Sequence, residues 1–410
     1  MTETTLDVYW GSTATLVGRA YLTTGRQTAT TFLYDEAYIR DGGVNIDPAL
    51  QLVTGTQYVP RLLPALADTA PDRWGRNLLD KAERARALSE GRRARSLEDV
   101  DYLLGVSDDT RQGALRFSTD GGKTFLGIDG NVPKLVALPR LLRSSDQLAC
   151  DDDSLEALKD LLDTGTTGLG GARPKASVLL DDGALAIAKF PHPSDRWDVM
   201  AWEALTLDLL ATAGIRVPDH QLVRLGERSV LLLRRFDRAE DGERVGYISA
   251  LTAVGADDGE HRDYIDITDA IKDLSNRTRA DLAELFRRVV ASVALGNTDD
   301  HLRNHGFLSR DGFWSLSPAF DVNPTPDVSK RRATSIAGAD SIDNEVDGLL
   351  AFAEDCDLTA AQAREHIDAV AGALADWDAR AARAGIPAAQ VNLMGESIRP
   401  RLEQVNAAAG

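Results

Sequence analysis

The stretch that decides the fold reads GNTDDHLRN at residues 296–304, and FDV follows it at residues 320–322. The carboxylate of Asp299 stands five residues before the amide of Asn304, as the base and the amide do in kinase catalytic loops. A second carboxylate, Asp321, comes later. Phosphoryl transfer from ATP needs this order of groups: a base for the acceptor hydroxyl and then two oxygen ligands for magnesium.

The surrounding pattern supports this interpretation. Residues 280–295 carry apolar side chains at helical spacing, and Gly296 ends the predicted helix. Residues 305–308 and 313–316 flank a Gly-ended turn and predict a hairpin, which can bring Asn304 and Asp321 to one ion. Asp, Asn and Gly also gather in turns for backbone reasons alone. Asp300 lacks the required spacing, so it either tunes its neighbour or faces solvent.

A cation for the ATP phosphates is expected upstream, on a strand. Two apolar runs flank the turn at residues 181–183, and the second run ends at Lys189. A helix predicted over residues 198–213 carries Glu203, and a strand lysine followed by a helix glutamate is the ion pair of kinases. The alternatives are a strand-end lysine that reaches solvent and a surface glutamate.

Before this hairpin, residues 164–175 read TGTTGLGGARPK. The glycines allow the backbone to approach an anion closely, although the spacing is not that of a Walker loop. The stretch is either a linker or a cover for phosphates, and its position favours the cover. Arg173 and Lys175 would add positive charge. The predicted nucleotide contacts here are Gly168, Gly170, Gly171, Ala172 and Lys175.

Five collinear stretches carry a family resemblance. They are PDRWGR at 71–76, RQGALRF at 111–117, GGARPKA at 170–176, RFDR at 235–238, and the pair 297–304 with 320–322. With them the chain resembles the HipA toxins, serine/threonine kinases of bacterial toxin–antitoxin modules. The resemblance implies an α+β, bilobal protein-kinase-like fold with a β-rich N-terminal subdomain and a mostly helical C-terminal lobe. The expected domains are 1–139, 140–235 and 236–410.

The resemblance also implies a role for each matching residue. ATP and Mg²⁺ are the implied cofactors, with Lys189 on the phosphates and backbone groups of residues 232–236 on adenine. The base would be Asp299. The remaining implied positions are His301 and Arg303 in the catalytic loop, Asn304 and Asp321 as magnesium ligands, and Glu203, Arg234 and Phe236 in nucleotide binding. Arg303 replaces the lysine of the best-studied members, which keeps the charge and changes the shape. For residues 235–238, a strand end with local ion pairs is the alternative.

One departure from the family concerns autoregulation. Some of these kinases inactivate themselves by phosphorylating a serine of the glycine-rich loop, and that position is Gly168 in this chain. Thr166 and Thr167 stand beside it and are the candidate replacements.

Composition is consistent with a cytoplasmic enzyme. The 410 residues predict two or three lobes, no apolar run has membrane-spanning length, and residues 1–7 do not form a signal peptide. Cys150 and Cys356 lack metal-type spacing and are expected to be free thiols. The net charge of −18 argues against direct binding to DNA. The basic runs at 84–95 and 330–332 are interpreted as an exposed helix face and a solvated loop, with an acidic-partner patch as the alternative.

The resemblance implies a small DNA-binding antitoxin of the HipB type as partner, with DNA reached only through it. It also implies growth arrest by phosphorylation of a cellular protein, for which an aminoacyl-tRNA synthetase is the family precedent. Two other functions stay open: a small-molecule phosphotransferase, and a catalytically silent module that binds antitoxin. A metal-dependent hydrolase built on the Asp and His residues of 299–305 is a more distant alternative.

Overall fold

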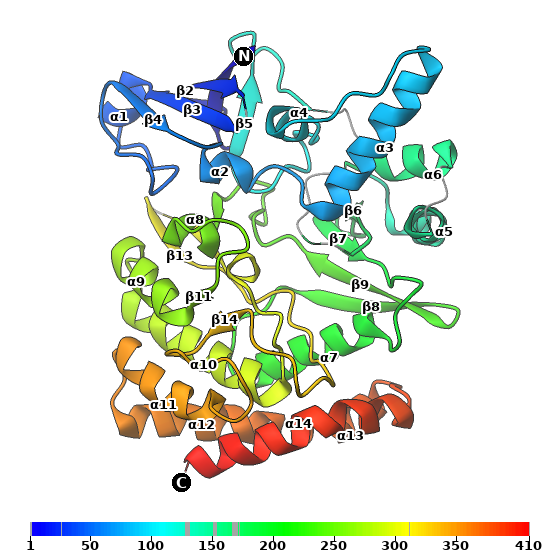
Figure 1. Cartoon of the computed structure of the whole chain (residues 1–410), viewed down its shortest axis with the longest axis vertical. Coiled ribbons are helices and arrows are strands. Elements are labelled where there is room, and N and C mark those ends of the chain that lie inside the picture. The colour runs from blue at the N-terminus through cyan, green and yellow to red at the C-terminus, as the bar shows by residue number, and fades with distance from the viewer. Residues whose placement is uncertain are drawn as a thin grey trace. The chain divides into compact units, whose positions relative to one another are not determined.

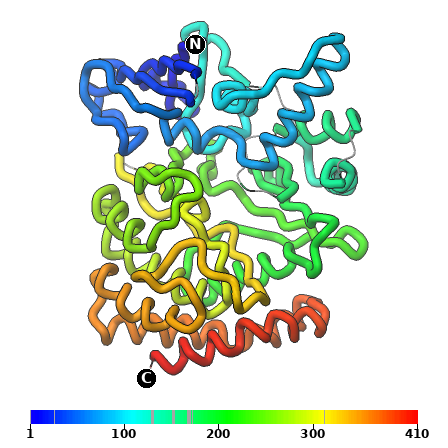
Figure 2. Tube along the Cα trace, in the orientation of Figure 1, coloured from blue at the N-terminus to red at the C-terminus, as the bar shows by residue number. Residues whose placement is uncertain are grey.

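The computed structural model describes residues 2–25, 27–127, 132–150, 154–165, 171, 173–310 and 312–409 (Figures 1 and 2). The chain divides into two compact units. The first unit comprises Met1–Asp195, Val223–Ile248 and Leu308–Gly312. The second comprises Arg196–Leu222, Ser249–Phe307 and Phe313–Gly410.

The N-terminal part of the first unit is built on a five-stranded antiparallel sheet in the order β4-β3-β2-β1-β5 (Figure 1). Alternating side chains such as Leu6, Val8 and Phe32 are fully buried, as expected for strands with one face on a core. The strands are β1 (Thr2–Trp10), β2 (Thr15–Thr24), β3 (Thr28–Tyr34), β4 (Thr56–Val59) and β5 (Leu115–Ser118). The N-terminal part of the chain is therefore rich in β-strands, as predicted.

A second sheet in the order β6-β7-β9-β8 shares a hydrophobic core with three helices of this unit. Its strands are β6 (Lys175–Leu179), β7 (Leu185–Lys189), β8 (His220–Leu225) and β9 (Arg228–Arg234). This core contains Val178 and Ala188 of the sheet. The helices contribute Trp74 and Leu78 from α3 (Arg73–Ser89), Leu141 from α5 (Leu138–Ala149) and Leu161 from α6 (Leu155–Leu162). The remaining helices of this unit are α1 (Glu36–Arg40), α2 (Pro64–Ala67), α4 (Asp99–Leu104) and the 3-10 turn η1 (Leu135–Ala137).

Two local predictions in this unit have opposite outcomes. The turn at residues 181–183 joins β6 and β7 as an antiparallel hairpin, which confirms the prediction. The turn residues at 120–122 also predict a short strand pair over residues 117–128, and this prediction is wrong, because β5 pairs with the distant β1 and the described residues 119–127 contain no second strand.

The second unit is mostly helical, and α10 (Thr278–Leu295) lies at its centre. This helix contacts α9 (Tyr264–Leu274), α11 (Glu345–Asp355), α12 (Ala360–Leu374) and α14 (Ala388–Ala409). Leu282, Phe286 and Val290 are fully buried on it, which confirms the predicted helix. The other helices are α7 (Val199–Thr212), α8 (Ala250–Val254) and α13 (Trp377–Arg383), and a short parallel pair joins β11 (Arg262–Asp263) to β14 (Thr334–Ser335).

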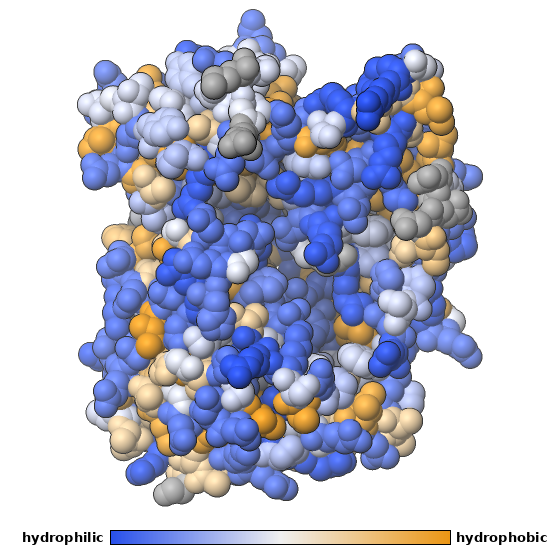
Figure 3. Space-filling model, viewed as in Figure 1, coloured by the Kyte–Doolittle hydropathy of each residue, from blue (hydrophilic) through white to orange (hydrophobic). Residues whose placement is uncertain are grey.

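A further sheet has three strands in the order β10-β12-β13. Its strands are β10 (Tyr247–Ser249), β12 (Gly306–Arg310) and β13 (Phe313–Leu316), so the hairpin predicted after the catalytic stretch is present. The face seen in Figure 3 is mainly hydrophilic, with scattered apolar residues. Within the described ranges, no helix is long and apolar enough to cross a membrane.

Candidate active site

The stretch 296–304 begins where α10 ends. Gly296 takes a left-handed conformation with φ 66°, and a Cβ there would lie 2.7 Å from the Ser397 hydroxyl, so glycine suits both the turn and the packing. The chain then passes through the 3-10 turn η3 (Leu302–Asn304). The side-chain amide of Asn304 donates to the backbone carbonyl of Asp299 at 3.1 Å. The loop is therefore closed on itself by the two residues that the spacing singled out.

Asp299 and Asp300 have opposite environments. The Asp299 side chain is 74% exposed, as a base that meets an external hydroxyl must be. The carboxylate of Asp300 is buried and accepts hydrogen bonds from the Tyr264 hydroxyl at 2.5 Å and the Ser292 hydroxyl at 3.1 Å. His305 Nε2 lies 3.0 Å from Asp300 Oδ1. Asp300 therefore does not face solvent, and the expectation that it tunes its neighbour Asp299 stays a prediction.

Electrostatics keep Asp300 ionised in this buried position. Burial of its carboxyl favours the neutral form, but the nearby His305 imidazole and the hydrogen bond from Tyr264 outweigh burial. The pKa of Asp300 therefore lies below its ordinary value. An ionised, fully bonded carboxylate fixes the backbone next to Asp299.

A chain of buried polar contacts continues from this carboxylate into the helices. Arg332 donates to the Ser292 hydroxyl at 2.5 Å and to the Asn297 carbonyl at 3.1 Å. It also pairs with Glu345 of α11 at 3.0 Å, and Glu345 pairs with Arg401 of α14 at 3.2 Å. These contacts connect the loop at 296–304 to α10, α11 and α14, and breaking one of the buried pairs would leave an uncompensated charge.

A small cavity of about 20 Å³ lies beside one of the two predicted magnesium ligands. Asn304 lines it together with Phe320 and Val322, the two neighbours of Asp321. A cavity of this size holds about one water molecule. It therefore marks where the two stretches meet, and it is too small to be a nucleotide pocket.

The residues around Asp321 fit a hard cation. Asp321 has φ 57°, a conformation that non-glycine residues adopt rarely and that is frequent at functional sites. The Asn323 amide donates to Asp321 Oδ1 at 3.4 Å, and Asn323 Oδ1 is buried without a donor among the described residues. The described residues contain no group of three His, Cys, Asp or Glu side chains suited to a metal. Magnesium needs only one or two carboxylates, since water and phosphates complete its shell.

The other two predicted catalytic-loop residues occupy peripheral positions. His301 is exposed, and its backbone carbonyl accepts from the Asn304 N–H at 2.8 Å. Arg303 donates through Nε to Asp258 at 3.1 Å, and the Asp258 side chain is mostly exposed. The structure thus places both residues on the loop, while a role in the chemistry stays a prediction for each.

In the first unit, the predicted phosphate-binding lysine is the last residue of β7. Lys189 is buried and lies opposite Lys175 in the β6–β7 register. Gly171 has φ 94°, a conformation that strains other residues, and a Cβ there would lie 2.5 Å from the end of the Lys175 side chain, which would have to move. Gly168, Gly170, Ala172, Thr166 and Thr167 lie outside the described residues.

The stretch PDRWGR at 71–76 holds the glycine-rich segment. Asp72 occupies the N-cap position of α3 without capping it, and instead accepts the Gly171 N–H at 2.6 Å. Trp74 Nε1 donates to the Lys175 carbonyl at 3.3 Å. At the other end of the segment, the Thr110 hydroxyl donates to the Gly165 carbonyl at 2.6 Å. The family resemblance included Asp72 without a role for it, and Thr110, which directly precedes the RQGALRF stretch, was not among the matched residues.

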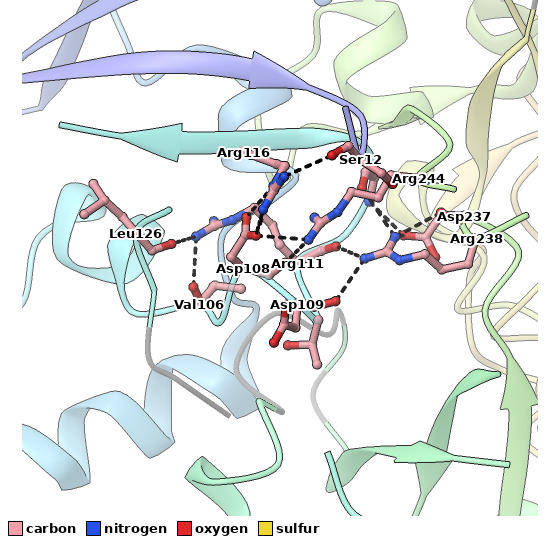
Figure 4. A network of polar contacts seen from close by, with 12 residues as sticks. Ser12, Val106, Asp108, Asp109, Arg111, Arg116, Leu126, Asp237, Arg238 and Arg244 are labelled. Carbon is pink, nitrogen blue, oxygen red and sulfur yellow. Dashed lines mark hydrogen bonds and ion pairs between the residues drawn. The ribbon is translucent and has the colours of Figure 1, made fainter. Parts of the chain in front are cut away.

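A buried arginine network joins RQGALRF to RFDR (Figure 4). Arg235 pairs with Asp237 at 2.6 Å, and Asp237 accepts the Gly113 N–H at 2.7 Å. Arg238 donates to the Arg111 carbonyl at 2.8 Å. Burial lowers the pKa of Arg111 to about 9, and its guanidinium donates to several backbone carbonyls. The local ion pairs expected as an alternative for 235–238 are therefore present, and they fix the end of β9.

The remaining predicted nucleotide contacts lie around the same strand end and in α7. Arg234, the last residue of β9, pairs with Asp182. The ring of Phe236 lies 6.3 Å from that of Tyr247. Glu203 is fully buried in α7, which belongs to the second unit, whereas Lys189 belongs to the first. The predicted Lys189–Glu203 ion pair stays a prediction.

Comparison with known protein families shows to which family the chain belongs. The sequence model of the HipA-like C-terminal domain matches residues 167–377, which is more than half of the chain. The chain belongs to the HipA family. This match contains most of the glycine-rich stretch and all of the stretch 296–304, so the resemblance inferred from the motifs is confirmed.

Curated relatives of this HipA-family chain are described as kinases. It is 24% identical over 272 residues to "Putative kinase Y4mE" of Sinorhizobium fredii, a match that covers 58% of the chain and 63% of the relative. It is 27% identical over 157 residues to a "Putative kinase" of Haemophilus influenzae, covering 34% of the chain and 46% of the relative. The chain thus matches less than two thirds of the length of either relative.

A solved structure shares the fold. A chain of the Shewanella oneidensis toxin–antitoxin complex of HipA, HipB and operator DNA matches with a TM-score of 0.67 at 14% identity. The match covers 98% of this HipA-family chain and 96% of the other. The predicted α+β, HipA-like fold is confirmed.

Proposed function

We propose that the chain is an ATP- and Mg²⁺-dependent protein serine/threonine kinase and the toxin of a HipBA-like module. The observation that carries the proposal is the exposure of the Asp299 carboxylate. Its loop is closed by the hydrogen bond from Asn304 and is anchored by the buried side chain of Asp300. Catalysis by positioning and electrostatics is what phosphoryl transfer requires of a protein, so a rigid loop with one open base suits it.

In the proposed reaction, Asp299 accepts the proton of a serine or threonine hydroxyl. The oxygen of that hydroxyl forms the new bond to the γ-phosphorus, while the bond from this phosphorus to the leaving ADP oxygen breaks. Lys189 and the backbone around Gly171 bind phosphates, and the strand end at 232–236 binds adenine. Magnesium, when bound by Asn304 and Asp321, neutralises charge on the phosphates.

The proposed partners follow the family. We infer a HipB-type antitoxin, which brings the complex to DNA, and a protein substrate in the cytoplasm. Phosphorylation of that substrate, with an aminoacyl-tRNA synthetase as the precedent, would arrest growth. The acidic net charge of −18 is consistent with contact to DNA through a partner.

The test offers γ-labelled ATP and Mg²⁺ to the purified chain with either lysate proteins or a metabolite panel. We expect labelled phosphoserine or phosphothreonine on protein, and no label with Asp299→Asn. Label on metabolites alone would favour a small-molecule phosphotransferase. Antitoxin binding without any transfer would favour a silent binding module.

A further inference from the structure

The basic run at residues 330–332 is not one surface patch. Its three side chains pair with three different carboxylates: Lys330 with Asp299 at 3.2 Å, Arg331 with Asp340 at 2.7 Å, and Arg332 with Glu345 at 3.0 Å. Arg332 is buried, and the Arg331 side chain is 74% exposed. The prediction of a solvated loop therefore holds for Arg331, while Lys330 lies against the proposed base.

Several contacts hold Lys330 in this position. The backbone N–H of Thr325 donates to the Gly296 carbonyl at 3.2 Å, and that of Ala333 donates to the Thr298 carbonyl at 2.9 Å. Between these two points, Arg332 donates to the Asn297 carbonyl at 3.1 Å. Residues 325–333 are thus attached along the stretch that leads to Asp299.

The turn before Lys330 is stabilised as well. Asp327 Oδ1 accepts the Ser329 N–H at 2.9 Å and the Ser329 hydroxyl at 2.6 Å. The Lys330 N–H lies 3.4 Å from the Asp327 carbonyl. The backbone contacts of residues 325–333 and this turn therefore fix the side of the loop from which the Lys330 side chain projects.

The catalytic loop has a cation of its own, Arg303, but its Nε atom donates to Asp258. The cation found at Asp299 Oδ1 is Lys330. An exposed ion pair of this kind contributes about 0–1 kcal/mol to folding, so its stability value does not explain the arrangement. The lysine ammonium is a mobile point charge on a flexible stem, which suits a changing ligand.

We propose that Lys330 is a further catalytic residue, whose ammonium contacts the transferred phosphoryl group at Asp299. This inference rests on the proposed kinase function. A base must lie within about 3 Å of the hydroxyl that it deprotonates. An ammonium 3.2 Å from the same carboxylate therefore lies next to the acceptor oxygen and the incoming phosphorus. Negative charge on the phosphoryl oxygens in the transition state is what a cation there stabilises.

The experiment compares Lys330→Met, which keeps most of the stem without the charge, with Lys330→Arg. Arg331→Met in the same loop is the matched control, because Arg331 pairs with Asp340. We expect Lys330→Met to lower kcat at least about tenfold, since loss of one donor to transition-state charge costs on the order of 10²–10³ in an enclosed site. The KM for ATP and the Tm should stay near wild type, Lys330→Arg should recover much of kcat, and Arg331→Met should be unchanged.

The outcomes separate the two proposals. If the wild type transfers phosphate and Lys330→Met keeps the same kcat, the role of Lys330 is overturned and the kinase proposal stands. A higher kcat in Lys330→Met would also overturn it, because Lys330 would then restrain the base. An equal loss of kcat in Arg331→Met would indicate an effect of the total charge of the loop, and it would count against a specific role for Lys330. If the wild type transfers no phosphate, the kinase proposal fails and takes this inference with it.

Discussion

The hydroxyl of Tyr264 on α9 donates a 2.5 Å hydrogen bond to the buried carboxylate of Asp300. This contact ties a helix to the residue beside the proposed base. Tyr264 is itself fully buried, and its ring lies edge-on to His305 at 5.7 Å. The stability of the fold and the position of Asp299 therefore depend on the same hydrogen bond.

Tyr264→Phe is expected to lower the free energy of unfolding by about 1–3 kcal/mol, because it leaves a charged acceptor with one donor fewer. Denaturant unfolding measures this. Turnover should fall at temperatures where the variant remains folded, since Asp299 loses its support. Tyr58→Phe, at a side chain that is 69% exposed, is the control. Equal stability of the two variants would contradict this account of Asp300.

Asp299→Asn should lower kcat by about 10²–10⁴, because the amide cannot accept the proton of the hydroxyl. The exposed side chain makes no buried contact, so Tm should stay near that of the wild type. ATP–Mg²⁺ should still raise the Tm of the variant. Turnover close to wild type would show that Asp299 is not the base.

Asp321→Asn tests the metal site while keeping a residue type that tolerates positive φ. We expect the Tm of the ligand-free protein to change little. The increase in Tm caused by ATP should lose its dependence on Mg²⁺, because the charged ligand is absent. Titration of Mg²⁺ at fixed ATP provides the measurement. An unchanged Mg²⁺ dependence would remove Asp321 from the site.

Asp72→Ala should raise the KM for ATP about tenfold with a smaller change in kcat. The charge-assisted bond to the Gly171 N–H is lost, and about 1.4 kcal/mol corresponds to tenfold in binding. Asp72→Asn keeps an acceptor oxygen and should recover most of the affinity. Asp99→Ala, which removes a half-exposed partner of Arg76, is the control. A wild-type KM in Asp72→Ala would show that this anchor does not act on nucleotide.

Asp47 predicts a pH dependence of stability in the N-terminal subdomain. Burial raises the pKa of this carboxyl to about 6, whereas unfolded Asp titrates near 3.9. Between pH 3.9 and pH 6 this carboxyl is ionised in the unfolded state but still protonated in the folded state. The free energy of unfolding therefore falls as pH rises through this range, and it stops falling above pH 6. Asp47→Asn should therefore gain up to about 2–3 kcal/mol relative to wild type between pH 4 and pH 7. A constant difference across this range would contradict the shifted pKa.

Some tertiary partners could not be predicted from the sequence. Asp300 had an ambiguous interpretation because the hydroxyl that binds it belongs to Tyr264 of α9, and no local pattern couples the two residues. The strand pair expected around residues 120–122 failed for the same reason, since β5 completes a sheet begun at the N-terminus. Local periodicity predicts elements, whereas pairing across long separations depends on burial of the whole chain.

The sequence by itself determined the family, the helix that ends at Gly296, and the pairing of Asp299 with Asn304, because a short spacing along one loop constrains geometry directly. Only the tertiary structure decided that Asp300 is a buried support, that Asp72 holds Gly171, and that Lys330 lies at Asp299. The physical reason is the same in each case. A charge takes its role from the partners that folding brings to it, and those partners are distant in sequence.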